Sequence, residues 1–336
     1  MGSDSRDRLA VSSRRHMARG ESLTEPMSSL KRLSLAALVL AFAQIVFGAI
    51  VRITGSGMGC GDHWPKCAGS WFPPHDRIDL IIEITHRYLA LALSIVILAL
   101  VVTALLRRKE NGVGGRRGVL RPSIIAGILV VTAALLGAVT VKLALNPFVI
   151  VAHLTIAMSL LATLAVAYAR AGGFGANADY TGASARTFRA ARGGVFLALT
   201  TLVFGALTAN VPDAAISCTG FPWCRDYMIY GAPLTIHVVH RIFAFLLFGH
   251  LLGAAIATGR RREPSIVKRA ARIAFGAVVL QLIVAAAMIE MNFPPQFRSL
   301  HQAVGTLVWL CVVVLAIVSA RARRAANDVD VMRQAA

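Results

Sequence analysis

Long apolar segments alternate along the chain with short connections that are rich in polar and basic residues. A helix that spans the hydrocarbon core of a bilayer needs about 20 predominantly apolar residues, and eight segments are close to that length. The pattern therefore predicts an all-α integral membrane protein with eight transmembrane helices. The expected spans are 32–54, 78–106, 122–143, 147–170, 193–211, 232–258, 269–291 and 298–320.

Composition and charge agree with a membrane protein. The 336 residues are 57% hydrophobic and only 15% charged, which is little charge for a soluble chain of this size. The net charge of +19 invites a nucleic-acid interpretation, but Lys and Arg lie almost wholly in alternate connections and in the tails. That distribution is an orientation signal, so no nucleic-acid partner is expected. It predicts a multi-pass protein of the cell membrane, surrounded by membrane lipid, with both termini cytoplasmic and outward loops at 55–77, 144–146, 212–231 and 292–297.

The two halves of the chain resemble each other in the placing of their polar residues. Each half holds four helices, an even number, so both halves insert in the same orientation and a pseudo-twofold axis along the membrane normal is predicted. At an offset of 154 residues, Glu83-x-x-His86-Arg87 matches His237-x-x-His240-Arg241. At an offset of 148, Lys142, Pro147 and His153 match Glu290, Pro295 and His301. At an offset of 157, Gly48-Ala49 matches Gly205-Ala206.

This repeat predicts two pseudo-twofold-related four-helix bundles that are joined by a linker. In chain order, we expect a disordered cytoplasmic tail, the N-terminal bundle, a cytoplasmic linker, the C-terminal bundle and a second cytoplasmic tail. The expected limits are 1–31, 32–171, 172–192, 193–320 and 321–336.

Four histidines fall at similar depths in the predicted membrane. Ionisable residues inside a spanning helix are costly, so they are functional candidates. At a rise of 1.5 Å per residue, His86 lies about 12 Å and His153 about 9 Å below the outer ends of their helices. His240 and His301 fall in the same outer layer of the second half. Two imidazoles that face each other in an apolar bundle suit the axial positions of an iron porphyrin.

Other interpretations of these histidines are weaker. A single buried histidine more often hydrogen-bonds one helix to another, but four repeat-related histidines at one depth favour haem. Zinc would need a compact set of three or four ligands, which neither half offers. A ferritin-like di-iron site would use Glu-x-x-His in both halves, and the second half has His237 in place of the glutamate.

Glu83 is the residue that most clearly distinguishes the two halves. The first half has this carboxylate where the second has His237. Burial raises the pKa of a carboxyl group and suits it to proton transfer, so Glu83 is the candidate catalytic residue. The alternative is a structural role as the partner of Arg87 or of a neighbouring histidine.

Several arginines lie near the histidines. Arg87 and Arg241, together with His237, are candidates for pairing with haem propionates or for supporting the histidine ligands. Arg52 and Arg298 lie near the outer interface, where they could also pair with propionates or extend to the lipid headgroups.

The outer loops carry two pairs of cysteines. Disulfides persist on the outer side of the membrane, so we expect one between Cys60 and Cys67 and a repeat-related one between Cys218 and Cys224. Closing so short a loop would contribute roughly 2–3 kcal/mol. A structural role and a redox role are both open.

These features together resemble the haem A synthase family over about residues 32–320. One histidine in a helix would be a weak signal, but the glycine-rich cysteine loop, the acidic helix motif and the spaced histidines form a specific set. The resemblance is carried by Thr54-Gly55-Ser56-Gly57, Cys60, Trp64-Pro65-Lys66-Cys67, Glu83-x-x-His86-Arg87, His153, His240 and His301.

The resemblance implies a reaction and a role for each half. The enzyme would be an oxidoreductase that converts the C8 methyl group of haem O to the formyl group of haem A by successive hydroxylations, for terminal oxidases. His240 and His301 would bind a resident haem b, and His86 and His153 the iron of the substrate haem. Glu83 matches the acidic residue proposed to stabilise charge on the methyl carbon or to relay protons.

The resemblance also implies partners. We expect a haem O synthase that delivers the substrate and an electron-transfer partner, and a homo-oligomer is compatible with the sequence. The alternative function is a dihaem b-type membrane cytochrome for electron transfer, which would place its haems at two depths. A transporter would explain neither the matched depths nor the cysteine loops.

Overall fold

The computed structural model describes residues 4–72, 77–180, 184–225 and 228–335. Eight helices in these ranges are long and apolar enough to cross a membrane, which confirms the predicted all-α, eight-span architecture. The elements are α1 (Asp4–Ile53), the 3₁₀-helix η1 (Ser56–Met58), α2 (Ile78–Leu106), α3 (Leu120–Lys142), α4 (Pro147–Arg170), α5 (Ala185–Asn210), α6 (Ala232–Arg260), α7 (Ser265–Glu290) and α8 (Pro295–Ala335).

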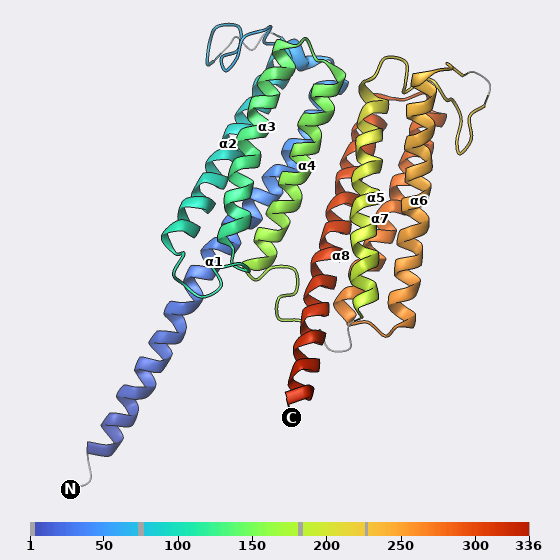
Figure 1. Cartoon of the computed structure of the whole chain (residues 1–336). Coiled ribbons are helices and arrows are strands. Elements are labelled where there is room, and N and C mark those ends of the chain that lie inside the picture. Colours follow the sequence, from blue (N-terminus) through green and yellow to red (C-terminus); the bar gives the residue numbers. More distant parts are fainter. Residues whose placement is uncertain (1–3, 73–76, 181–183, 226–227, 336) are drawn as a thin grey trace.

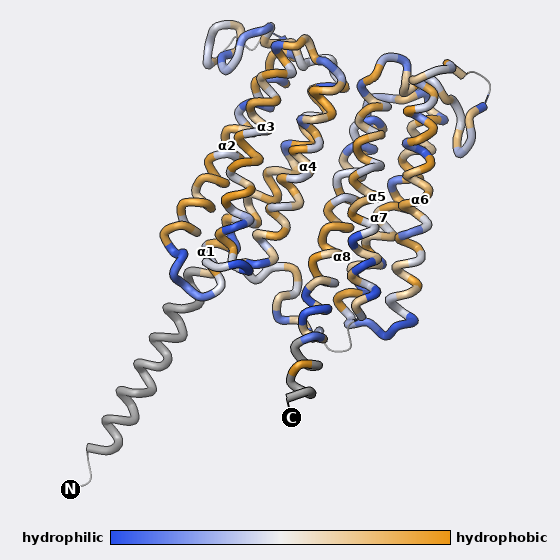
Figure 2. The backbone as a smooth tube through the Cα atoms, in the orientation of Figure 1, coloured by the Kyte–Doolittle hydropathy of each residue, from blue (hydrophilic) through white to orange (hydrophobic). Residues whose placement is uncertain are grey.

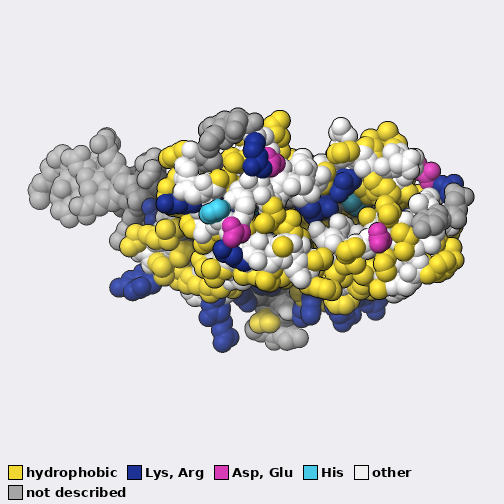
Figure 3. Space-filling view, turned by 90° about the horizontal axis from the view of Figure 1, so that it is seen from above, with side chains coloured by type: hydrophobic (Ala, Val, Ile, Leu, Met, Phe, Trp, Pro, Cys, Tyr) yellow, Lys and Arg dark blue, Asp and Glu magenta, His cyan; other side chains and the backbone are white. Residues whose placement is uncertain are grey.

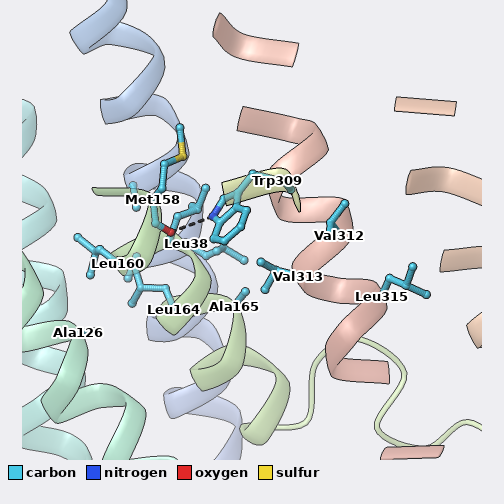
Figure 4. Close-up of a cluster of buried hydrophobic side chains, with 14 of the residues drawn as sticks. Leu38, Ala126, Met158, Leu160, Leu164, Ala165, Trp309, Val312, Val313 and Leu315 are labelled. Atoms are coloured by element: carbon cyan, nitrogen blue, oxygen red, sulfur yellow. Dashed lines mark hydrogen bonds between the residues drawn. The ribbon is translucent and has the colours of Figure 1, made fainter. Parts of the chain in front are cut away.

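The helices form two groups, α1–α4 and α5–α8, that stand side by side (Figure 1). Helices α1 and α4 of the first group contact α8 of the second, and α4 also contacts α5. Buried side chains of both groups meet at this junction, where Nε1 of Trp309 in α8 donates a hydrogen bond of 2.9 Å to the Met158 carbonyl in α4 (Figure 4). The two groups correspond to the bundles expected from the repeat, whose pseudo-twofold relation and limits stay predictions.

Polar residues gather at the two ends of the helix groups, and the middle is apolar (Figure 2). The middle also presents apolar side chains outward: Leu91, Ile95 and Leu98 follow one face of α2 and are 57%, 57% and 62% exposed. An exposed apolar stripe of this kind suits contact with lipid chains.

The ends of several helices differ from the predicted spans. Helix α1 begins at Asp4, inside the segment that was expected to be a disordered tail, and α8 continues to Ala335 through the predicted C-terminal tail. The sequence limits mark where apolar residues stop, whereas helix formation depends on backbone propensity and does not require apolar side chains.

Helices α4 and α8 both start at a proline that directly follows a tight corner. Pro147 and Pro295 occupy the first helical position, where a missing N–H costs nothing. Two successive residues with positive φ precede each proline: Ala144 and Leu145, and Asn292 and Phe293. These corners lie 148 residues apart, the offset that the sequence repeat predicts for this part of the chain.

Candidate functional site

The four candidate histidines lie in the upper part of the helices, towards the end that carries the cysteine loops. Helices α2, α4, α6 and α8 all begin at that end (Figure 1). Each histidine lies in the second or third turn of its helix. Within each helix group the two histidines lie near each other, His86 near His153 and His240 near His301. The structure thus brings the residues together as two pairs.

In the second group, neighbouring helices hold both histidines. Nδ1 of His240 lies 3.0 Å from the Thr201 carbonyl in α5. The Gln281 amide in α7 donates to the His301 carbonyl at 3.0 Å and lies 3.0 Å from Nδ1 of that ring. Gly205 leaves room for the first imidazole, because a Cβ there would lie only 2.8 Å from Cε1 of His240. Each ring is therefore oriented by a group on another helix.

A cavity lies between these two histidines. It offers about 190 Å³ to water-sized molecules, and apolar side chains such as Leu247 and Val278 make up most of its wall. Three arginines, Arg52, Arg241 and Arg298, also line it. Two imidazoles across a mostly apolar cavity with a cationic rim fit an iron porphyrin, whose ring is apolar and whose carboxylates are anionic.

In the first group, the histidines have fewer polar contacts. The Gln44 amide in α1 donates to the His86 carbonyl at 3.0 Å and lies 3.3 Å from Nε2 of the ring. The Phe47 ring stacks near His86, with 6.3 Å between ring centroids, and a Cβ on Gly48 would lie 3.0 Å from Cε1. Nδ1 of His86 and Nδ1 of His153 are buried without a hydrogen-bond partner among the described residues.

Glu83 and Arg87 attach the first cysteine loop to α2. Glu83 is only 4% exposed, and its carboxylate accepts from the Cys60 backbone N–H at 2.7 Å and from Nη2 of Arg87 at 2.5 Å. Nη1 of Arg87 donates to the carbonyls of His63 and Lys66, both at 2.9 Å. The ion pair with Arg87 is the structural role that the sequence offered for Glu83 as the alternative to catalysis. The same contacts also fix a buried carboxylate three residues before His86.

The second group repeats the arginine contacts but not the acid. Nη2 of Arg241 donates to the Cys218 carbonyl at 2.7 Å and Nη1 to the Gly220 carbonyl at 2.8 Å. His237 replaces the glutamate, and its Nδ1 lies 2.9 Å from the Ala214 carbonyl. A carboxylate reaches this loop from α7 instead, where Glu290 accepts from the Phe221 backbone N–H at 3.0 Å and pairs with Arg225. The sequence repeat gave no hint of that contact.

Both predicted disulfides are present. Cys60 is bonded to Cys67 and Cys218 to Cys224. The first pair is almost fully buried, with Cys60 1% and Cys67 0% exposed.

Seen from the loop end, basic side chains lie among apolar ones over both helix groups (Figure 3).

Comparison with known proteins identifies the family. The family COX15-CtaA, described as cytochrome oxidase assembly protein, matches residues 31–80 and 77–313. The chain belongs to this family. Among its relatives are proteins named heme A synthase from Alkalihalophilus pseudofirmus (29% identical, covering 75% of this chain and 86% of the relative), Geobacillus kaustophilus (28%, 71% and 75%) and Staphylococcus haemolyticus (28%, 84% and 92%).

Sequence reasoning missed the two glutamines. Gln44 and Gln281 are uncharged, and they do not match each other at any of the repeat offsets. Neither the charge pattern nor the repeat therefore marked them as candidate site residues. An amide in the middle of an apolar helix is nevertheless costly without a partner, which was a usable signal. Each reaches a different member of its histidine pair, so the two groups orient their rings in different ways.

We predict that Arg87→Met loosens the first loop. The change leaves the buried Glu83 carboxylate unpaired, and breaking a buried ion pair in this way costs about 3–5 kcal/mol. The Cys60–Cys67 disulfide should then be reduced at a lower thiol concentration, measured by mass shift after alkylation, whereas Cys218–Cys224 serves as the internal reference. Arg77→Met is the matched control, because Arg77 pairs with Asp79 on the exposed surface and should change stability by less than about 1 kcal/mol. Equal reducibility in wild type and Arg87→Met would contradict the prediction.

Proposed function

We propose that the chain is a haem A synthase, an oxidoreductase that converts the C8 methyl group of haem O to a formyl group by successive hydroxylations, for terminal oxidases. The observation that carries the proposal is the two pairs of histidines near the loop end of the helices, together with the buried carboxylate of Glu83, whose matching position in the second half is His237. Relatives named heme A synthase support the synthesis of haem A in general.

The second helix group is proposed to hold a resident haem b through His240 and His301. Nδ1 of His240 faces the Thr201 carbonyl, which fixes the tautomer and leaves Nε2 for a metal. The Gln281 contacts restrict the His301 ring in turn. An iron porphyrin bound there would supply one-electron redox chemistry, and the protein supplies its orientation and a largely apolar surrounding.

The first helix group is proposed to hold the substrate haem O through His86 and His153. Among the described residues, Nδ1 of His86 and Nδ1 of His153 have no hydrogen-bond partner, whereas Nδ1 of His240 lies 3.0 Å from the Thr201 carbonyl.

Glu83 is proposed to be the catalytic carboxylate of the first group. The Cys60 N–H and the Arg87 guanidinium both donate to it and hold the carboxylate in one position. A fixed negative charge near the substrate stabilises positive charge that develops on the methyl carbon. The same oxygens can accept a proton that leaves that carbon.

The remaining assignments complete the proposal. The bundle of residues 32–171 is the substrate half and that of 193–320 the haem b half, in the cell membrane with both termini cytoplasmic. This orientation rests on the basic connections at the end of the helices opposite to the cysteine loops. A haem O synthase delivers the substrate, and an electron-transfer partner removes electrons.

Co-expression with a haem O synthase tests the activity directly. We expect haem A or its hydroxylated intermediate among the extracted haems, separated by chromatography. Cells that carry the haem O synthase alone are the control. Accumulation of haem O alone in the presence of the protein would overturn the proposal and favour an electron-transfer cytochrome.

We predict that Glu83→Gln lowers haem A formation by about 10²-fold or more, in the range of acid–base residues, and leaves the b-type absorption spectrum in place. Gln keeps the shape of the side chain but removes its charge. Glu290→Gln is the matched control, because it makes the same change at the carboxylate that supports the second loop. Near-normal product from Glu83→Gln would refute the catalytic assignment.

We predict that His240→Ala and His301→Ala each remove the b-type spectrum of the purified protein, because each deletes one proposed axial ligand. His86→Ala should keep that spectrum and instead reduce turnover or trap a hydroxylated intermediate. Visible absorption of the reduced protein and chromatography of its haems give the two readouts. Unchanged spectra in both C-terminal variants would remove the cofactor assignment.

A further inference from the structure

Two of the arginines that line the cavity of the second group make few polar contacts in the described part of the chain. Arg241 donates from both Nη atoms to the second cysteine loop. Arg52 makes one long hydrogen bond, 3.2 Å from Nη1 to the Ala209 carbonyl, and Arg298 has no carboxylate partner in the described part of the chain. Among the residues that line the cavity there is no Asp or Glu. The cavity wall therefore carries positive charge that nothing in it balances.

The positions of these two guanidinium groups are specific. Arg52 lies in the last turn of α1, which belongs to the first helix group, yet it reaches α5 and the cavity of the second. Arg298 lies in the first turn of α8, three residues before His301 and on the same helical face. Both guanidinium-bearing residues line the same cavity. Such an arrangement is unfavourable in a mostly apolar cavity unless an anion lies between or beside them.

We propose that Arg52 and Arg298 bind the two carboxylates of the porphyrin that occupies the second cavity. This inference rests on the proposed function and identifies the residues that recognise the polar edge of the ligand. Guanidinium groups pair with carboxylates through two parallel hydrogen bonds. Arg52 and Arg298 would then hold the carboxylates at the loop end, and His240 and His301, about one helical turn deeper, would hold the iron.

The sequence has no arginine pair at the positions of the first histidine site that match Arg52 and Arg298. At the repeat offsets of 157 and 148 residues, the positions that match Arg52 and Arg298 are Ala209 and Ile150, which carry no charge. Carboxylate recognition by this pair is therefore a property of the second site only. It also makes the two groups interdependent, because a helix of the first completes the binding site of the second.

The test compares an iron porphyrin with its dimethyl ester. The full-length His86→Ala protein, in which only the second pair of histidines is complete, is purified without haem and titrated with iron protoporphyrin or with the ester. Each charge-assisted contact is worth about tenfold or more in affinity, so the free acid should bind at least about tenfold more tightly than the ester. Arg52→Gln, Arg298→Gln and the double variant should bring this ratio towards one by weakening binding of the acid only. Arg52→Lys and Arg298→Lys should restore part of it.

Arg272→Gln is the matched control, because Arg272 is exposed near the start of α7, at the opposite end of the helices. Its acid-to-ester ratio should equal that of the parent protein. Equal affinity of the parent protein for acid and ester would overturn the inference without any variant, and so would an unchanged ratio in the Gln variants. In either case a normal two-histidine spectrum would leave the proposed haem site intact, whereas absence of any haem binding by the wild-type chain would overturn both.

Discussion

The ion pair between Glu83 and Arg87 connects the helix of the first histidine to the loop above it. One carboxylate accepts from the loop backbone at Cys60 and from Arg87, and the same guanidinium binds two loop carbonyls. A charged pair is costly among apolar helices unless every donor and acceptor is satisfied, and the loop supplies the missing partners. The loop, the disulfide and the upper end of α2 thus form one rigid unit over the proposed substrate site.

The two helix groups share a helix arrangement but differ in their polar side chains. Both hold a pair of histidines at one depth, and both attach a disulfide loop to an arginine. The groups differ in their polar contacts. The position of Glu83 in the first half corresponds to that of His237 in the second. A glutamine contacts the first histidine of one pair, His86, but the second histidine of the other, His301. These differences lie in side chains around helices that carry their histidines at the same distance from the first helical residue, so the local chemistry differs while the helix arrangement does not.

The sequence predicted the features that depend on local pattern. Apolar length located all eight helices, the loop cysteines formed the expected disulfides, and helical rise placed the histidines near the loop end. The helix ends were less predictable, because α1 continues as a helix far beyond its apolar part. Contacts between distant segments were not predictable from one sequence: the bond from Cys60 to Glu83, the reach of Gln44 to His86 and the passage of Arg52 into the other group all depend on tertiary packing.

The two tight corners before α4 and α8 determine where the second histidine of each pair lies and in which direction its side chain points. Each corner turns the chain at two residues of positive φ, and the proline that follows begins the helix at once. His153 and His301 are each the sixth residue after that proline, so the corner fixes both their height and their direction. One added residue between proline and histidine would turn the imidazole by about 100° and lower it by about 1.5 Å. The positions of His153 and His301 therefore depend on the two corners as well as on the helices that carry them.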